Sequence, residues 1–132
     1  MGITQYNVGK KWEETLLDYY SNRGFFAYKF PTEYKGTICD IIVSKNGSCM
    51  FIEAKRITGK KLYYKGCGIY KKKDEINRFV EKTNNNVYIM IKSDKLGVYW
   101  TTWVIAKDIF EKKGYLDLET DCFCANRGDI NG

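Results

Sequence analysis

Two apolar segments joined by a short turn constrain the fold of this chain more than any other feature. Residues 38–44 (ICDIIVS) and 49–57 (CMFIEAKRI) are rich in apolar and β-branched residues, and an Asn-Gly pair at 46–47 lies between them. Asn-Gly between two such runs is typical of a tight β-hairpin. The chain is therefore predicted to contain two neighbouring antiparallel strands, around which the remaining elements must pack.

Both strands carry charged residues at positions where a core strand would be apolar. Side chains two apart in a strand share a face, so Glu53 and Lys55 project together, and Asp40 can meet them at one end of the sheet. Two carboxylates and an ammonium are costly to bury among Ile, Val and Phe unless they have partners or a function. A divalent metal ion and a phosphate group would supply both.

The remaining periodicity predicts a mixed α/β domain in the order α-β-β-β-α-β-β-α, with a central mixed sheet flanked by helices. Helical spacing of apolar residues, followed by glycine or asparagine, marks the segments 9–22, 69–82 and 106–113. Besides the hairpin, apolar runs with β-branched or aromatic residues mark strands at 25–30, 87–91 and 98–104.

Length and composition fit one domain. With 132 residues, of which 44% are hydrophobic, the chain can form one core and little more. We expect a single domain over 1–132, with irregular arms at 1–8 and about 118–132 and a mobile loop at 58–68. No apolar run is long enough to cross a membrane, and the N-terminus lacks the apolar stretch of a secretory signal, so a cytoplasmic location is expected.

Histidine and cysteine usage excludes several kinds of site. The chain has no histidine, and its five cysteines form no CxxC pair, so the common zinc frameworks and the Ser-His and Cys-His nucleophile systems are absent. An odd number of cysteines in a β-rich core indicates reduced thiols. Any hydrolytic reaction must therefore depend on carboxylates, lysine and a metal ion.

The net charge of +6 is concentrated in residues 54–73, which contain no acidic residue. A basic band beside a cluster of acids is expected of a protein that binds a polyanion and acts on it through a metal, although a solvated lysine-rich loop would have the same composition. The tyrosines in this band either stack on bases or pack the loop. The residues expected to contact DNA are Lys29, Arg56, Lys60, Lys61, Lys65, Lys71, Lys72, Lys73, Tyr63 and Tyr64.

A third carboxylate can join the pair on the strands. Glu13 shares the face of Leu16 and Leu17 in the predicted first helix, so it points along the core side. Hard oxygen ligands suit Mg²⁺, with Mn²⁺ as a substitute. Lys55 can act as a base toward water or as a charge that stabilises the phosphate, and both roles stay open. Alternatively, Glu53 and Lys55 form an ordinary ion pair worth about 0–1 kcal/mol.

The pattern Asp-x12-Glu-Ala-Lys, with each part in an apolar strand, resembles the PD-(D/E)xK nuclease superfamily. The closer resemblance is to Holliday junction resolvases of the RecU and archaeal Hjc type, and it covers roughly residues 9–110. Residues 9–13 resemble the glycine and glutamate of their first-helix motif, and residues 29–32 resemble the Lys-x-Pro-Thr segment of RecU-type enzymes. Residues 51–55 (FIEAK) resemble their Phe-Glu-Ala-Lys strand.

This resemblance implies a restriction-endonuclease-like fold and a DNA-cleaving homodimer that nicks two strands of a four-way junction symmetrically. It also implies that Glu13, Asp40 and Glu53 bind the metal ion and that Lys55 is the catalytic lysine. A compact resolvase of this kind would suit a phage-encoded enzyme that acts in the host cytoplasm.

The sequence departs from the family pattern at three places. No proline precedes Asp40, the segment between Pro31 and Asp40 is too short for the stalk of RecU-type enzymes, and the His-Gln signature after the lysine strand is absent. Two alternatives therefore accompany the resolvase interpretation. One is another nuclease of the superfamily, of restriction, repair or transposon type, and the other is a non-catalytic nucleic-acid-binding module with the same fold.

Overall fold

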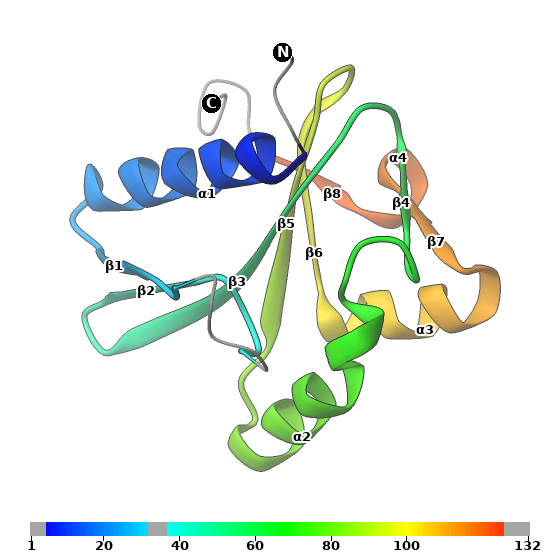
Figure 1. Cartoon of the computed structure of the whole chain (residues 1–132). Coiled ribbons are helices and arrows are strands. Elements are labelled where there is room, and N and C mark those ends of the chain that lie inside the picture. Colours follow the sequence, from blue (N-terminus) through cyan, green and yellow to red (C-terminus); the bar gives the residue numbers. More distant parts are fainter. Residues whose placement is uncertain (1–4, 32–36, 126–132) are drawn as a thin grey trace.

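The computed structural model describes residues 5–31 and 37–125. Its centre is a six-stranded mixed sheet in the order β1-β2-β3-β5-β6-β8 (Figure 1). Strands β3 and β5 run parallel, whereas the other neighbouring pairs run antiparallel. The strands of this sheet are β1 (Phe26–Lys29), β2 (Ile41–Lys45), β3 (Ser48–Ile57), β5 (Val87–Ser93), β6 (Gly97–Thr102) and β8 (Phe123–Cys124).

Helices and a small second sheet complete the described part of the chain. The helices are α1 (Gln5–Ser21), α2 (Lys73–Thr83), α3 (Trp103–Lys113) and α4 (Leu118–Asp121), and a 3₁₀ turn, η1 (Tyr70–Lys72), precedes α2. The small sheet pairs β4 (Lys61–Tyr63) with β7 (Tyr115–Asp117). The predicted central mixed sheet flanked by helices is confirmed. Within the described ranges, no helix has the length and apolarity that a bilayer crossing requires.

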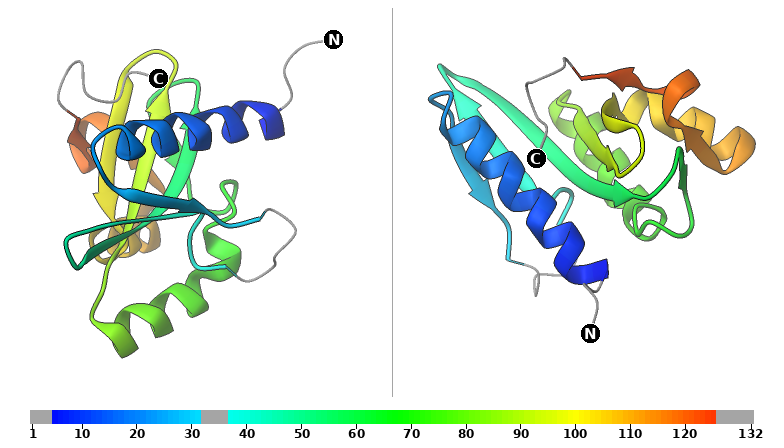
Figure 2. Two further views of the ribbon diagram at one scale, coloured as in Figure 1. Left: turned by 90° about the vertical axis from the view of Figure 1, so that its left-hand side faces the viewer. Right: turned by 90° about the horizontal axis from the view of Figure 1, so that it is seen from above.

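Helices cover both faces of the sheet. Seen from above in Figure 2, α1 lies on one side of β3, and α2 and α3 lie on the other. Trp12 of α1 packs in one buried cluster with Ile52 of β3, whereas Ile76 of α2 and Phe110 of α3 share a second cluster with Ile89 of β5. Strand β3 is therefore enclosed on both faces, and a charged side chain near its middle is removed from water.

The predicted hairpin forms around the Asn-Gly pair. Asn46 and Gly47 have φ angles of 52° and 84°, the left-handed conformation that a two-residue hairpin turn requires. Ile41 faces Ile52 across the pair. The predicted strand 38–44 begins later than expected, at Ile41, so Asp40 lies immediately before β2 and not within it.

The segment 58–68 is not the mobile loop that its composition predicts. Its residues 61–63 form β4 and pair with β7, a partner distant in the sequence. Leu62, Tyr64 and Ile69 are buried in the main core. Glycine and lysine content favoured a solvated loop, but two buried side chains within the segment, and Ile69 just after it, hold it in the core that α2 and α3 also form.

Two further boundaries differ from the prediction. The strand expected over 98–104 ends at Thr102, because Trp103 begins α3 and its indole N–H donates to Asn77 Oδ1 at 2.7 Å. The arm expected at about 118–132 is partly ordered, since α4 and β8 occupy residues 118–121 and 123–124, and residues 126–132 lie outside the described ranges. The first helix begins at Gln5, earlier than the predicted residue 9.

Neighbouring tyrosines provide a test of this packing. Tyr64 is 5% exposed and stacks on Phe110 with ring centroids 4.4 Å apart, whereas Tyr63 is 57% exposed. We expect Tyr64→Ala to lower the free energy of unfolding by about 3–5 kcal/mol, because it leaves a cavity against Phe110. Tyr63→Ala, the matched control, should cost less than about 1 kcal/mol. Urea denaturation of the two variants measures both values, and equal losses would contradict this packing.

Candidate active site

Two carboxyl groups meet at one end of the β2–β3 pair. Glu53 lies in the middle of β3 beside Ile89 of β5 and is only 1% exposed. Asp40 precedes β2, and its backbone N–H donates to Ile52 O at 2.9 Å. Its side chain continues the ladder, because Asp40 Oδ2 accepts from the Ala54 N–H at 2.9 Å. The backbone contacts of Asp40 thus aim its carboxyl group at the part of β3 that carries Glu53.

Electrostatic coupling between these two groups is strong. Burial, and then the charge of the facing Glu53, raises the pKa of Asp40 to about 7. The Ala54 N–H and the Lys72 ammonium oppose this rise without cancelling it. Two carboxylates that repel one another in a buried site are an arrangement that a cation would stabilise.

Two lysines contact Glu53, one at each oxygen. Lys55 Nζ lies 3.1 Å from Oε2, and Lys72 Nζ lies 2.7 Å from Oε1. Lys55 also donates to the backbone carbonyl of Cys67 at 2.6 Å. Burial alone would lower the pKa of Lys55, but Glu53 and Asp40 together outweigh it and raise that pKa above its usual value. Lys55 therefore carries its proton at neutral pH in the free protein.

The third predicted carboxylate, Glu13, borders this centre. Its Oε1 lies 3.3 Å from Nζ of Lys29 on β1, and both side chains are mostly buried. Its charge contributes to the raised pKa of Asp40, so Glu13 faces the same region as the other two acids. The helix face predicted from its spacing to Leu16 is thus the face that the structure uses.

The donor set fits a hard divalent cation. Within the described ranges, no three acidic or cysteine side chains are arranged to hold a metal ion together, and Glu13 is joined to Lys29. Mg²⁺ is commonly bound through one or two carboxylates together with substrate phosphate. Asp40 and Glu53 supply two such carboxylates, and metal ligation by these two residues and by Glu13 remains a prediction.

A thiol not foreseen as part of the site, that of Cys39, is affected by the charges of both acids. Cys39 is fully buried, and burial, Glu53 and Asp40 raise its pKa to about 12. The thiol is therefore neutral at physiological pH and adds no negative charge to that of the two acids. All five cysteines are free, and their reduced state stays a prediction.

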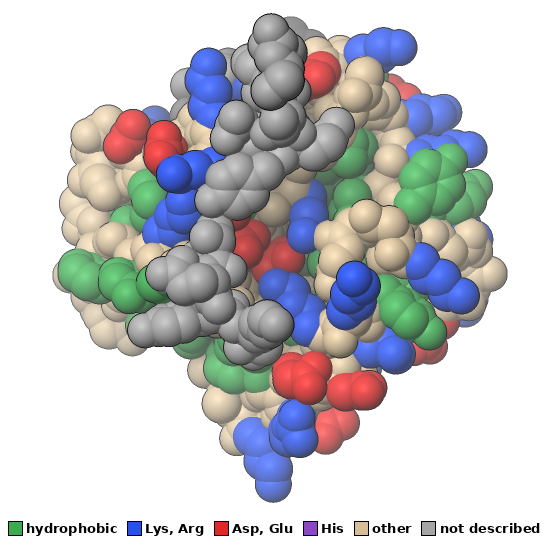
Figure 3. Space-filling model, viewed as in Figure 1, with side chains coloured by type: hydrophobic (Ala, Val, Ile, Leu, Met, Phe, Trp, Pro, Cys, Tyr) green, Lys and Arg blue, Asp and Glu red, His purple; other side chains and the backbone are tan. Residues whose placement is uncertain are grey.

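Part of the predicted DNA-binding set lies on the surface. Figure 3 shows acidic side chains in the middle of one face, over β3, with lysine or arginine side chains beside them. The exposed members of the predicted set all come from the segment between β3 and α2, and their role in DNA binding stays a prediction. They are Lys60, Lys61, Tyr63, Lys65 and Lys71.

Other members of that set occupy different positions. Lys29 and Lys72 form ion pairs with Glu13 and Glu53, so both belong to the centre itself. Lys73 Nζ lies over the ring of Tyr70, 4.0 Å from its centroid. Tyr64 is buried on Phe110 and cannot stack on a base, which corrects the prediction made for it. Alternation of side chains along a strand or loop explains why neighbours have such different environments.

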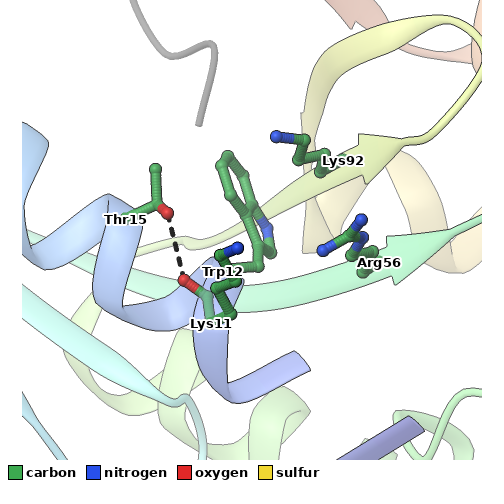
Figure 4. A pocket seen from close by; sticks show the side chains of 5 residues that line it. All are labelled: Lys11, Trp12, Thr15, Arg56 and Lys92. Carbon is green, nitrogen blue, oxygen red and sulfur yellow. Dashed lines mark hydrogen bonds between the residues drawn. The ribbon is translucent and has the colours of Figure 1, made fainter. Parts of the chain in front are cut away.

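Arg56 lies on the other side of β3 from Lys55. It lines a small basic hollow with Lys92 of β5 and with Lys11, Trp12 and Thr15 of α1, as Figure 4 shows. Its guanidinium also pairs with Asp94, with Nη2 and Oδ1 3.0 Å apart. Arg56 is therefore separated from the acidic centre by the strand, and any contact that it makes with DNA would be on the α1 side.

Sequence reasoning could not single out two groups of this centre. Cys39 lies next to Asp40, and Lys72 lies within a run of three lysines. Nothing in the local sequence indicates that either side chain points inward. One signal for Lys72 was the missing His-Gln signature, because Lys72 lies in the region where the family pattern would have it. Thr32, the last residue of the motif at 29–32, lies outside the described ranges.

Comparisons with known proteins identify a family and a similar fold. The family model described as archaeal Holliday junction resolvase (hjc) matches residues 4–122. Among solved structures, the chain is similar to Archaeoglobus fulgidus Hjc, a Holliday junction resolvase from an archaeal hyperthermophile, with 20% identity, a TM-score of 0.53 and 71% of each chain covered. This likeness confirms the predicted restriction-endonuclease-like fold. No match was found among curated proteins.

The raised pKa of Asp40 has a measurable consequence for stability. Between about pH 4 and pH 7, the folded protein keeps a proton on Asp40 that the unfolded chain has released. Without divalent ions, the free energy of unfolding should therefore fall as the pH rises through this window, by up to about 4 kcal/mol. Asp40→Asn should remove this part of the slope. Urea titrations of both proteins in EDTA measure it, and identical slopes would contradict the coupling.

Proposed function

The chain belongs to the archaeal Holliday junction resolvase family, and we propose that it is a Mg²⁺-dependent endonuclease that cleaves four-way DNA junctions. Membership of this family implies a nuclease. The observation that carries the finer proposal is the meeting of Asp40 and Glu53 in a buried centre, with the charged Lys55 in contact. The net charge of +6 suits a polyanionic substrate.

Asp40 and Glu53 are the residues that would hold the cation, with Glu13 as a further ligand once it leaves Lys29. A divalent cation bound there would polarise a phosphoryl oxygen and make water more acidic. In the reaction, a water oxygen forms a bond to phosphorus, and the bond from phosphorus to one bridging oxygen breaks. One water proton ends on the leaving oxygen, and the other ends on the new phosphate or in solvent.

Lys55 acts in this proposal as a charge and not as a base. Glu53 and Asp40 hold its pKa above the usual lysine value, so a neutral amine is disfavoured at physiological pH. Its ammonium is held in place by Glu53 and by the Cys67 carbonyl, which suits the stabilisation of negative charge on the phosphate. Of the two roles left open for Lys55, these contacts support the electrostatic one.

The working unit in this proposal is a homodimer. Resolution of a junction requires two nicks in opposite strands, and each chain supplies one acidic centre within its described ranges. A symmetric pair of copies would place one centre at each nick. The exposed lysines between β3 and α2 lie on the same chain segment as Lys72 and are available to contact DNA phosphates beside the centre.

Substitution of Asp40 tests the proposed activity most cleanly. We expect Asp40→Asn to lower the cleavage rate of a synthetic four-way junction in Mg²⁺ by about 10³-fold, because a cation ligand is lost, while binding changes little. Glu53→Gln should also abolish cleavage, but it leaves two lysines without their anion and should destabilise the fold as well.

Product analysis separates the alternatives. The resolvase proposal requires paired nicks in opposite strands of the junction. Equal cleavage of linear duplex would instead support a restriction, repair or transposon-type nuclease of the same fold. Salt-sensitive binding without cleavage, in Mg²⁺ and in Mn²⁺ and indifferent to Asp40→Asn, would identify a non-catalytic binding module.

Glu13 and its neighbour allow a matched test of the third carboxylate. Glu13 faces Lys29, and its charge acts on Asp40, whereas the next residue, Glu14, is exposed. We expect Glu13→Gln to reduce junction cleavage by about 10-fold or more and to raise the Mg²⁺ concentration needed, because a ligand or its charge is lost. Glu14→Gln should leave both unchanged. Equal effects of the two substitutions would show that Glu13 has no specific role in the active site.

A further inference from the structure

One lysine of the basic segment turns inward to the acidic centre. Lys72 ends the 3₁₀ turn η1, and its Nζ lies closer to Glu53 than Lys55 Nζ does, at 2.7 Å against 3.1 Å. Its neighbours point elsewhere, since Lys71 is exposed and Lys73 lies over the ring of Tyr70. Three consecutive lysines therefore have three different environments, and only the middle one contacts the centre.

The backbone of Lys72 is fixed by the core. Its N–H donates to Ile69 O at 3.1 Å, and Ile69 is fully buried. Ile76, one turn further along α2, is also buried, at 1% exposure. Lys72 is thus anchored at the junction of η1 and α2, and its contact with Glu53 is a property of the folded core and not of a freely moving loop.

The two lysines on Glu53 differ in what else holds them. Lys55 keeps the Cys67 carbonyl at 2.6 Å as a second partner. For Lys72, the side-chain hydrogen bond within the described ranges is the one to Glu53. If a bound cation drew the Glu53 oxygens away from the lysines, Lys55 would therefore retain a partner. The Lys72 ammonium, whose charge already acts on Asp40, would be released in a partly exposed position.

We propose that Lys72 is a second catalytic lysine of this centre. In the free protein it neutralises the charge of Glu53, and in the reaction its released ammonium pairs with a non-bridging oxygen of the scissile phosphate. The growing negative charge on that phosphate is then offset from two sides, by Lys55 on β3 and by Lys72 on η1. This assignment rests on the proposed nuclease function and replaces the surface phosphate contact predicted for Lys72.

The proposal is tested with Lys72→Gln, Lys72→Arg and the control Lys82→Gln, at an exposed lysine of α2 outside the predicted DNA-binding set. Single-turnover cleavage of a synthetic four-way junction is followed over a range of Mg²⁺ concentrations, and junction binding is measured without divalent ions. We expect Lys72→Gln to lower the maximal rate about 100-fold, while binding stays within about threefold. Lys82→Gln should keep the maximal rate within about twofold, because its side chain is exposed to solvent and lies outside the predicted DNA-binding set.

The Mg²⁺ dependence distinguishes a catalytic role from a purely structural one. In Lys72→Gln, the ammonium that competes with the cation for Glu53 is absent. The half-saturating Mg²⁺ concentration should therefore fall in this variant. In Lys72→Arg it should rise, because a guanidinium can hold the carboxylate with two hydrogen bonds. The arginine variant retains the charge, so it decides the question if the glutamine variant does not fold.

Several results would overturn this assignment. One is a maximal rate of Lys72→Gln within about threefold of that of the unsubstituted protein. Others are equal losses in Lys82→Gln and Lys72→Gln, and a loss of rate that only follows a loss of binding or stability. An unchanged Mg²⁺ requirement in Lys72→Arg would have the same meaning. If the unsubstituted protein does not cut the junction, the proposed function itself fails; if it cuts and Lys72→Gln cuts equally well, only the role of Lys72 fails.

Discussion

The close approach of Asp40 and Glu53 is the constraint on which the rest of the centre depends. Two carboxyl groups in a site with little water are costly, and the protein meets this cost with nearby positive groups. The Ala54 N–H contacts Asp40, and two ammonium groups contact Glu53. Even so, the pKa of Asp40 stays near 7, which means that the centre is incompletely compensated in the free protein. That residual repulsion is what makes a divalent cation a suitable ligand.

The topology of the sheet supplies these compensating groups. Parallel strands cannot be joined by a tight turn, so the chain must leave β3, cross over one face of the sheet and return as β5. In this chain the crossover contains β4, η1 and α2, and it carries the Cys67 carbonyl and Lys72 back to Glu53. The same segment also carries the exposed lysines of the predicted DNA-binding set. One crossover thus supplies both the lysine that compensates the charge of Glu53 and the lysines that are proposed to contact DNA.

Local sequence patterns predicted much of the fold. The hairpin, the shared face of Glu53 and Lys55, and the core-side position of Glu13 follow from turn chemistry and from strand and helix periods, which depend only on near neighbours. The prediction that Tyr64 stacks on a base was wrong, because its burial depends on Phe110 of α3, which is distant in the sequence. The prediction of a mobile loop at 58–68 was wrong for the same reason, since β4 forms by pairing with the distant strand β7.

Sequence by itself therefore determined which chemical groups are available and which of them share a face within one element: three acids and a lysine in apolar surroundings, beside a band of positive charge. Tertiary structure alone decided that Lys72, and neither Lys71 nor Lys73, would pair with Glu53, and that Cys39 would be buried where the charges of the acids act on it. The physical reason is that a period assigns faces within a helix or a strand. It does not determine where an aperiodic segment crosses the sheet, which is settled by packing between residues distant in the chain.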